Sequence, residues 1–279
     1  MKQACIVVPI YKTFKQLSKE ELRSLNQLFF IFCKIDIFFI CGKSFESFDY
    51  IQECKKANTV PVITKFHDRY FSSIEGYNKL MLSPKFYRKF EAYNFMLVYQ
   101  LDAFVFRNDL DEWCNRNYDF IGAPWFEGWD VPNYSRTIIG VGNGGFSLRN
   151  IKSSVVGLKK MNTTRKIWKW YQTSNLKSQI DLFKIFTAIK FFFPVRYHAQ
   201  TFAFLFDDKN RFNEDVIFGQ YLSYFHLGYK VAPIEEAMLF SFENNPSYLY
   251  ELTNQRLPFG CHAWEKYDPI FWEKFINTQ

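Results

Sequence analysis

The chain has 279 residues, which is enough for one large α/β domain or two modest ones and too many for a peptide hormone or a stapled mini-protein. Its hydrophobic fraction of 48% and charged fraction of 23% are ordinary for a globular protein. The net charge of +7 comes from basic residues scattered among Asp and Glu rather than from a tail, so no nucleic-acid partner is expected.

Strand and helix signals alternate through the first hundred residues, which favours an α/β fold with a mainly parallel sheet and helices on both faces. A capping box at Ser18 and Glu21 predicts the start of a helix, and Pro84 is typical of a first helical turn. The expected elements are, in chain order, strand 4–10, helix 18–32, strand 35–41, strand 60–66, helix 83–93 and strand 95–101.

The second half of the chain is expected to be less regular and more helical. Gly, Pro and Trp cluster between Asp102 and Gly145, which predicts a long functional loop. No internal repeat or low-complexity linker interrupts the sequence, so we expect a single domain over 1–279. The elements expected beyond the loop are helix 152–193, helix 213–226, strand 229–233 and a C-terminal helix.

Cysteine usage and the N-terminus bear on location. The six cysteines form no C-x-x-C pair and no framework of short spacings, which argues against a zinc ribbon or a disulfide scaffold. The N-terminal residues lack the pattern of a secretory signal, and the most apolar stretch, 28–41, is interrupted by Lys34 and Asp36. We therefore expect a cytoplasmic protein with reduced thiols and no membrane crossing.

The aromatic fraction of 21% is higher than a core requires. One interpretation is compositional drift, because Phe, Lys and Asn are all plentiful. The other is that some rings line a site for flat, hydroxylated ligands, since ring faces stack on sugars and bases. Both interpretations stay open for the chain as a whole.

Asp102 is the first candidate for chemistry, because it directly follows the apolar run 95–101. Ligands of open α/β sheets bind beyond the carboxyl ends of the strands. A carboxylate buried there must be paired or must bind a cation. The alternative is a turn cap or an ion pair with Arg107.

A glycine-rich segment is the second candidate. Gly140, Gly142 and Gly145 spell G-x-G-x-x-G, but they lead into a strand-like run, whereas a dinucleotide fingerprint opens a helix. We therefore reject a Rossmann site. Such glycines let backbone N–H groups approach a ligand closely, and a tight bulged hairpin is the alternative.

An acid pair and a late histidine complete the set. Asn213 is a good N-cap, and Glu214 and Asp215 occupy the first helical turn, where the helix dipole alone explains acids. His262 stands in the phrase Gly-Cys-His-Ala-Trp, and a lone histidine is more often structural than a ligand.

These elements, in this order, resemble the core of the GT-A glycosyltransferases. The chain more closely resembles a family long described as a domain of unknown function and common in glycan-synthesis loci. The phrases that carry the resemblance run from 7–12 to Trp264, and they are Tyr99-Gln100-Leu101-Asp102-Ala103, Asp119-Phe120-Ile121-Gly122-Ala123-Pro124-Trp125, Gly142-Asn143-Gly144-Gly145-Phe146-Ser147-Leu148-Arg149, Asn213-Glu214-Asp215-Val216 and Gly260-Cys261-His262-Ala263-Trp264.

The resemblance implies a GT-A-like fold with a nucleotide-binding half at 1–106, an acceptor and catalytic half at 107–264 and a C-terminal helix at 265–279. It also implies a role for each matching residue. The residues expected to bind the donor are Pro9, Ile10, Tyr11, Asp102, Gly144 and Gly145, those expected to bind a metal are Asp102 and His262, and the catalytic acid pair is Glu214 and Asp215, with the aspartate as general base.

The metal motif is incomplete. Asp102 matches one acid of the family's D-x-D motif, but its neighbours Leu101 and Ala103 leave a single carboxylate. Mn²⁺ or Mg²⁺ coordinates about six oxygen-rich ligands, and one Asp, one His, two phosphate oxygens and two waters can supply them. A metal-free version with Lys or Arg on the phosphates is the alternative.

The resulting hypothesis is a glycosyltransferase that moves a sugar from a nucleotide-sugar donor, expected to be UDP-linked, to a glycan or lipid-linked acceptor with inversion. Bacterial surface glycans such as capsule or lipopolysaccharide are the expected products. The rings expected to stack on the acceptor or close over the donor are Trp125, Phe126, Trp129 and Tyr134. Two alternatives are a non-enzymatic glycan-binding module and a glycoside hydrolase that draws two carboxylates from Asp102, Asp119, Glu127, Glu214 and Asp215.

A further hypothesis concerns the cytoplasmic face of the membrane. Residues 152–196 interleave lysines and arginines with Trp, Tyr and Phe, which is typical of a segment resting on an anionic leaflet. The alternative is a helix that packs its rings inside and solvates its lysines.

Overall fold

The computed structural model describes residues 2–56, 62–128, 135–174, 199–207 and 212–276. The strands are β1 (Lys2–Pro9), β2 (Ile37–Gly42), β3 (Val62–Phe66), β4 (Tyr93–Tyr99), β5 (Ala103–Val105), β6 (Phe120–Ile121), β7 (Ala123–Phe126), β8 (Ile138–Gly142), β9 (Phe146–Asn150), β10 (Ser241–Phe242) and β11 (Gly260–His262). The α-helices are α1 (Lys19–Ile31), α2 (Phe48–Lys56), α3 (Ile74–Met81), α4 (Pro84–Arg88), α5 (Leu110–Asn115), α6 (Ile151–Thr173), α8 (Ala199–Phe206), α9 (Glu214–Val216), α10 (Ile234–Phe240), α11 (Pro246–Leu252) and α12 (Pro269–Ile276).

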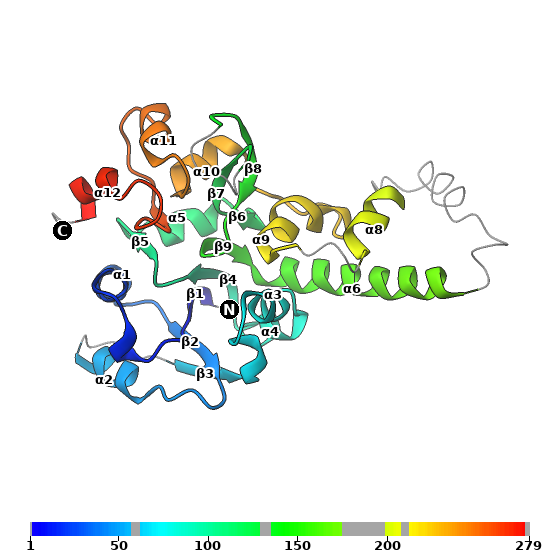
Figure 1. Ribbon diagram of the computed structural model, residues 1–279, viewed down its shortest axis with the longest axis horizontal. Helices are drawn as coiled ribbons and strands as arrows, with labels where there is room; N and C mark the ends of the chain where they lie inside the picture. Colours follow the sequence, from blue (N-terminus) through cyan, green and yellow to red (C-terminus); the bar gives the residue numbers. More distant parts are fainter. Residues whose placement is uncertain (1, 57–61, 129–134, 175–198, 208–211, 277–279) are drawn as a thin grey trace.

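The described strands build one large sheet in the order β3-β2-β1-β4-β9-β6 (Figure 1). The first four strands are parallel, and β9 runs antiparallel to β4, with Tyr99 opposite Phe146. Parallel strands need crossover connections, and these are the helices that the alternating sequence pattern predicts. The mixed, mainly parallel α/β class is therefore confirmed.

Helices cover both faces of this sheet, because its strands are apolar on both sides. Along β1, Ile6 and Val8 pack in one core cluster with α1, α2 and α5, whereas Cys5 and Val7 pack in another with α3, α4 and α6. Successive side chains of a strand point to opposite faces, so a continuous apolar run needs two layers of helix. The first strand is fixed in the centre of the fold by this burial.

Two smaller sheets extend the structure beyond β4. One has the order β10-β11-β5 and carries a third core cluster with α11 and α12, centred on Trp272. The other pairs β7 with β8. The segment between Asp102 and Gly145 is thus not one long loop, because four short strands and α5 lie within it.

Several expected elements differ in extent. The helix expected at 83–93 ends at Arg88, because β4 already begins at Tyr93, and α2 and α3 were not expected at all. The helix expected at 213–226 breaks into α9, a π-helical turn η4 (Ile217–Tyr221) and a 3-10 turn η5 (Leu222–Tyr224). The expected strand 229–233 is reduced to one bridge between Phe120 and Val231. Helix α6 confirms the expected helix from 152 to 173, but it ends there because Ser174 is extended, and 175–193 lie outside the described residues.

The glycine segment is neither a dinucleotide turn nor a hairpin. It leads from β8 into β9 rather than into a helix, which confirms the rejection of a Rossmann site, and the two strands belong to different sheets. All six cysteines are free, and all but Cys33 are buried. In the described part of the chain, no helix is both long and apolar enough to cross a membrane.

Candidate active site

The site begins where β4 ends. The chain leaves β4 at Tyr99, turns through Gln100 and Asp102, and enters β5. The backbone N–H of Gln100 donates to the carbonyl of Gly145 at 2.8 Å, so the glycine turn before β9 lies beside this turn. Asp102 therefore lies at the carboxyl edge of the parallel strands, as expected for a ligand site in an open sheet.

The small sheet carries His262 to the same edge. Its antiparallel register pairs His262 with Ala103, and its parallel register pairs Phe242 with Cys261, so Glu243 comes next to the histidine. The His262 Nε2 atom lies 3.2 Å from an Asp102 oxygen, and Nδ1 lies 3.0 Å from a Glu243 oxygen. The imidazole is thus held between two carboxylates.

Charge around the imidazole sets its protonation. Burial by itself lowers the pKa of His262, but the carboxylates of Asp102 and Glu243 together raise that pKa well above 6.5. Burial raises the pKa of Asp102, yet the histidine opposite holds it below 3.8. Gly145 makes this packing possible, because a Cβ there would lie 1.9 Å from His262 Nε2.

The acid pair at the start of α9 is divided between two environments. Glu214 is buried and forms an ion pair with the buried Arg149 at 2.7 Å. The same guanidinium hydrogen-bonds the hydroxyls of Tyr87 and Ser147 at 3.0 and 2.9 Å. Gly144 has to lack a side chain, because its Cβ would lie 2.2 Å from a Glu214 oxygen. Glu214 therefore anchors the start of α9 to β9 beside the glycine turn.

Asp215 is the other member of the pair and has a different environment. Its carboxylate accepts a hydrogen bond from the backbone N–H of Val216 at 2.9 Å. Burial and the negative charges of Glu214 and Glu243 raise its pKa from 3.8 to about 7, against a smaller opposing effect of Arg149. A carboxyl with a pKa near neutrality can give and take a proton at physiological pH.

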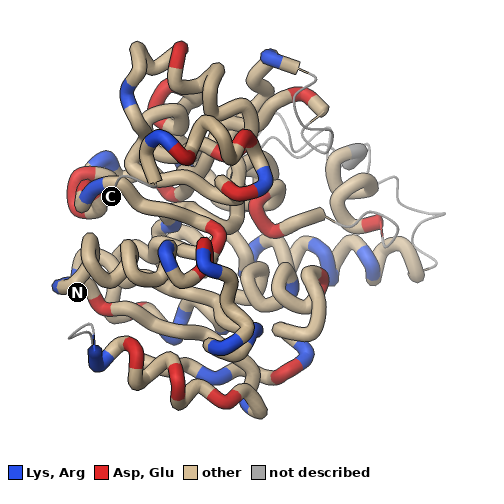
Figure 2. The backbone as a smooth tube through the Cα atoms, turned by 60° about the vertical axis from the view of Figure 1, so that its left-hand side comes forward, with Lys and Arg blue, Asp and Glu red and all other residues tan. Residues whose placement is uncertain are grey.

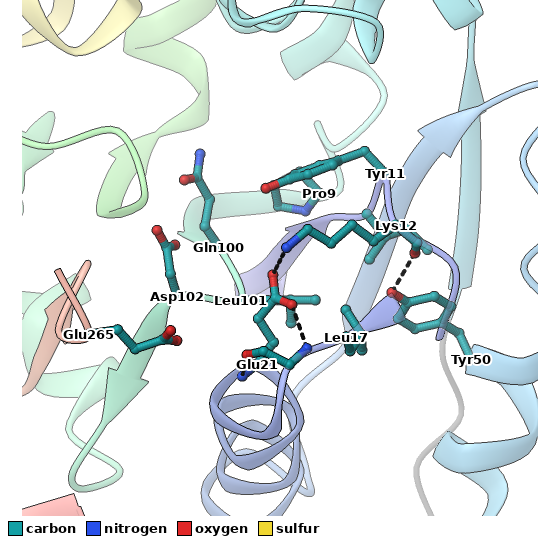
Figure 3. Close-up of a pocket in the computed structure, with 12 residues that line it drawn as sticks. Pro9, Tyr11, Lys12, Leu17, Glu21, Tyr50, Gln100, Leu101, Asp102 and Glu265 are labelled. Atoms are coloured by element: carbon teal, nitrogen blue, oxygen red, sulfur yellow. Dashed lines mark hydrogen bonds and ion pairs between the residues drawn. The ribbon is translucent and has the colours of Figure 1, made fainter. Parts of the chain in front are cut away.

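A pocket of about 260 Å³ opens beside Asp102. Figure 3 shows Gln100, Asp102 and Glu265 on one side of it and Tyr11 and Lys12 on the other. The Lys12 ammonium binds a Glu21 oxygen at 2.7 Å, and the N–H of Ser18 caps the other oxygen at 2.9 Å. The residues that line the pocket are Pro9, Ile10, Tyr11, Lys12, Leu17, Ser18, Glu21, Tyr50, Gln100, Leu101, Asp102 and Glu265.

The structure brings most of the expected residues to this edge. Pro9, Ile10 and Tyr11 line the pocket with Asp102, and the glycine turn touches both His262 and Glu214. Sequence segments more than 100 residues apart therefore meet at one edge of the sheet.

The expected acceptor-binding rings are not placed there. The Trp125 side chain is only 4% exposed, and its ring packs against Gly142. The ring was expected to stack on a sugar, and its position in the β7–β8 layer does not support that role. Phe126 is buried in the third cluster, and Trp129 and Tyr134 lie outside the described residues.

The carboxylates of the hydrolase alternative are dispersed. Asp119 lies near Asn150, at the opposite end of β9 from the glycine turn, and caps the backbone N–H of Lys230 at 2.8 Å. Glu127 is exposed at the end of β7. Neither lies at the edge that holds Asp102 and Asp215.

Four residues of the site were missed in the sequence. Arg149 ends a quoted phrase but was given no role, and Glu243, Gln100 and Glu265 were not considered as site residues. The sequence did hold a signal that Gln100 belongs to the site, because Gln100 precedes Asp102 in the same turn. For Glu243, only the strand register reveals its place beside His262.

The described residues contain no group of three or more His, Cys, Asp or Glu side chains that could hold a metal ion by themselves. The pair of Asp102 and His262 nevertheless fits a divalent cation that takes its further ligands from a substrate. Glu243 holds Nδ1 of the imidazole, which leaves Nε2 directed at Asp102. Metal-binding histidines commonly have such a carboxylate on the second ring nitrogen.

The fold and this edge define an α/β protein with a polar, acidic site at the carboxyl ends of its parallel strands. The chain belongs to the family described as "Protein of unknown function (DUF5672)", whose model matches residues 62–262. This agrees with the resemblance to a domain of unknown function seen in the sequence. No curated protein matches the chain.

Solved glycosyltransferase structures show a weak overall likeness. GlyE of Streptococcus pneumoniae TIGR4 is 11% identical over 98% of this chain and 59% of its own, with a TM-score of 0.48. The galactosyltransferase LgtC, in complex with donor and acceptor sugar analogs, is 13% identical over 98% of this chain and 95% of its own, with a TM-score of 0.47. A glycosyltransferase involved in the glycosylation of the major capsid of PBCV-1 is 8% identical over 99% of this chain and 100% of its own, with a TM-score of 0.39.

All three structures are glycosyltransferases. Identities this low and TM-scores below 0.5 transfer no activity to the chain. It spans about 60% of the length of the pneumococcal chains.

Proposed function

We propose that the chain is a glycosyltransferase that moves a sugar from a nucleotide-sugar donor to an acceptor hydroxyl. One observation carries the proposal. A carboxylate with a pKa near 7, Asp215, lies at the same sheet edge as a carboxylate–imidazole pair and a pocket large enough for part of a nucleotide. A base and a charge-binding pair are the two groups that transfer from a diphosphate requires.

The donor lies in the pocket beside Asp102 in this proposal. Tyr11, which is 64% exposed at the pocket, offers a ring face to a nucleobase, and Pro9 and Ile10 form the apolar floor. Lys12 is already engaged by Glu21, so it is not the main partner of the diphosphate. The diphosphate is instead bound at the edge formed by Asp102 and His262.

A divalent cation bound there would neutralise the charge that develops on the leaving diphosphate. The chain would hold it with an Asp102 oxygen and with His262 Nε2 after that nitrogen has given up its proton, while Glu243 would keep the imidazole oriented through Nδ1. Mn²⁺ and Mg²⁺ both accept oxygen and imidazole ligands, with substrate oxygens and waters completing the set. The incomplete D-x-D motif is therefore compatible with a metal.

Asp215 is the general base in this proposal, and Glu214 is not. The acceptor hydroxyl gives its proton to the Asp215 carboxylate as its oxygen bonds to the anomeric carbon, and the bond from that carbon to the diphosphate breaks. Attack opposite the leaving group inverts the configuration. Glu214 is paired with Arg149, and this pair holds the start of α9 against β9 beside the glycine turn.

The experiment is transfer from a panel of UDP-sugars and other nucleotide sugars, with Mn²⁺, with Mg²⁺ and with EDTA. Asp215→Asn should lower kcat by about 10²–10⁴ with little change in UDP affinity measured by calorimetry. Asp111→Asn, which changes an exposed carboxylate on α5, is the matched control and should behave as wild type.

Three results would count against the proposal. They are absence of transfer from every activated sugar, wild-type activity in Asp215→Asn, and hydrolysis of oligosaccharides without a nucleotide. The last result would favour the glycoside hydrolase. Saturable sugar binding with no nucleotide binding would favour a glycan-binding module.

A further inference from the structure

Helix α6 has an unusual charge pattern. Over its 23 residues it carries no acidic side chain, and Figure 2 shows basic segments recurring along it. The basic residues are Lys152, Lys159, Lys160, Arg165, Lys166 and Lys169. An ordinary solvated helix face mixes both signs, because opposite charges three or four positions apart stabilise a helix.

Three of these lysines form a row. Lys152, Lys159 and Lys166 are spaced seven residues apart, which is close to two helical turns, and all three are exposed. With a rise of about 1.5 Å per residue, the row is about 21 Å long. The opposite side of α6 is buried against the core through residues that include Leu158, Met161 and Trp168. The row therefore lies on the side of α6 away from this core, where Lys152 and Lys159 also line a hollow with Arg88 and Glu91.

Two large apolar side chains are exposed at the end of this row. Trp170 is four positions beyond Lys166 and is 60% exposed, and Ile167 is 55% exposed. The rings of Trp168 and Tyr171 pack inward instead. The helix thus buries part of its aromatic set, as the plainer interpretation of the sequence expected, but leaves one tryptophan among lysines on the outside.

We propose that the outward face of α6, formed by Lys152, Lys159, Lys166, Ile167 and Trp170, docks on an anionic lipid bilayer. Lysines near such a surface are attracted to its negative potential, and tryptophan favours the interface between headgroups and acyl chains. A nucleic acid would use the lysines but offers no apolar layer for Ile167. The proposal does not depend on the glycosyltransferase activity.

Figure 1 shows how α6 lies in the fold. The helix begins after Asn150, at the end of β9 opposite the glycine turn, and extends away from the sheets with α8 beside its far end.

The test is co-sedimentation with vesicles at low salt. The intact chain should pellet with vesicles of equal phosphatidylglycerol and phosphatidylcholine and stay in solution with phosphatidylcholine alone. Each lysine contributes about fivefold to partitioning onto the anionic vesicles. The triple variant K152E/K159E/K166E should therefore lower partitioning by at least about a hundredfold. The matched control K34E/K43E/K55E has the same net charge and changes exposed lysines elsewhere, so it should stay within a few-fold of wild type.

Trp170→Ser is a second, independent variant that keeps every charge. It should lower partitioning several-fold, and circular dichroism checks that each variant is folded. Equal losses in both triple variants would assign binding to net charge and overturn the proposal. So would a wild-type protein that stays in solution with the anionic vesicles, or one that binds duplex DNA as tightly as vesicles with no effect of Trp170→Ser.

Discussion

Two acidic clusters lie at the carboxyl edge of the sheet, and each contains one basic side chain. The two basic side chains pair with their neighbouring carboxylates in different ways. In the first, the His262 imidazole is shared by two carboxylates, Asp102 and Glu243. In the second, the Arg149 guanidinium is paired with Glu214, and the adjacent carboxylate, Asp215, accepts a hydrogen bond from a backbone N–H.

The difference shows how neighbouring carboxylates acquire separate tasks. Beside its histidine, Asp102 has a lowered pKa and stays ionised, as a charge-binding group requires. Beside an already paired glutamate, Asp215 has a pKa of about 7 and can take a proton. Burial and the charges of Glu214 and Glu243 raise the pKa of Asp215, and the Arg149 guanidinium is paired with Glu214, so the proposed base is Asp215.

The largest effect is expected from removing that cation. Arg149→Met should lower the free energy of unfolding by about 3–5 kcal/mol, because it leaves Glu214 charged and buried without its partner. R149M/E214M should recover most of the loss, since an apolar pair replaces both charges. Urea denaturation of the folded variants measures both values.

Arg116→Met is the matched control for that change. Arg116 pairs with Glu236 at the surface, where an ion pair contributes about 1 kcal/mol or less. An equal loss from Arg149→Met and Arg116→Met would show that the buried pair does not anchor the second cluster.

The second effect concerns stability against pH. Because the pKa of Asp215 is raised on folding, from 3.8 to about 7, the folded protein holds that proton more tightly. Its stabilising contribution is complete below pH 3.8 and is lost as pH rises to 7. Asp215→Asn, which stays neutral, should therefore match wild type near pH 4 and exceed it by about 2–4 kcal/mol at pH 8.

Urea midpoints at pH 4 and pH 8 measure this difference. The exposed Asp111→Asn should give the same small change at both values. The prediction fails if the gain in Asp215→Asn is independent of pH, because burial and the charges of Glu214 and Glu243 would then not raise the pKa of Asp215 against the opposing effect of Arg149.

The sequence located residues by local signals. Asp102 follows an apolar strand, Glu214 follows an N-cap, and Gly144 and Gly145 stand where a side chain would collide with the site. Such signals depend on neighbours within a few positions. The positions of the first four strands along the chain followed in the same way, from short apolar runs separated by helical patterns.

Partners could not be located in this way, because they depend on register between distant strands. Glu243 reaches His262 only through the pairing of β10 with β11, and Arg149 reaches Glu214 across 65 positions. The direction in which an aromatic ring points also depends on the pairing of distant strands. Trp125 was expected to face a ligand because it lies in the predicted loop between Asp102 and the glycines, but the pairing of β7 with β8 places its ring over Gly142.

The smallest effect is expected from the first cluster. Glu243→Gln keeps an oxygen near His262 Nδ1 but removes the charge that orients the imidazole, so Mn²⁺ affinity in the presence of UDP should fall by about 10–100-fold. Electron paramagnetic resonance of free Mn²⁺ measures this without any turnover. Glu265→Gln, a pocket carboxylate, is the control and should change the affinity less. Unchanged affinity in Glu243→Gln would show that Glu243 does not position the histidine, whereas absence of Mn²⁺ binding in the wild type would assign the Asp102–His262 pair to a metal-free role.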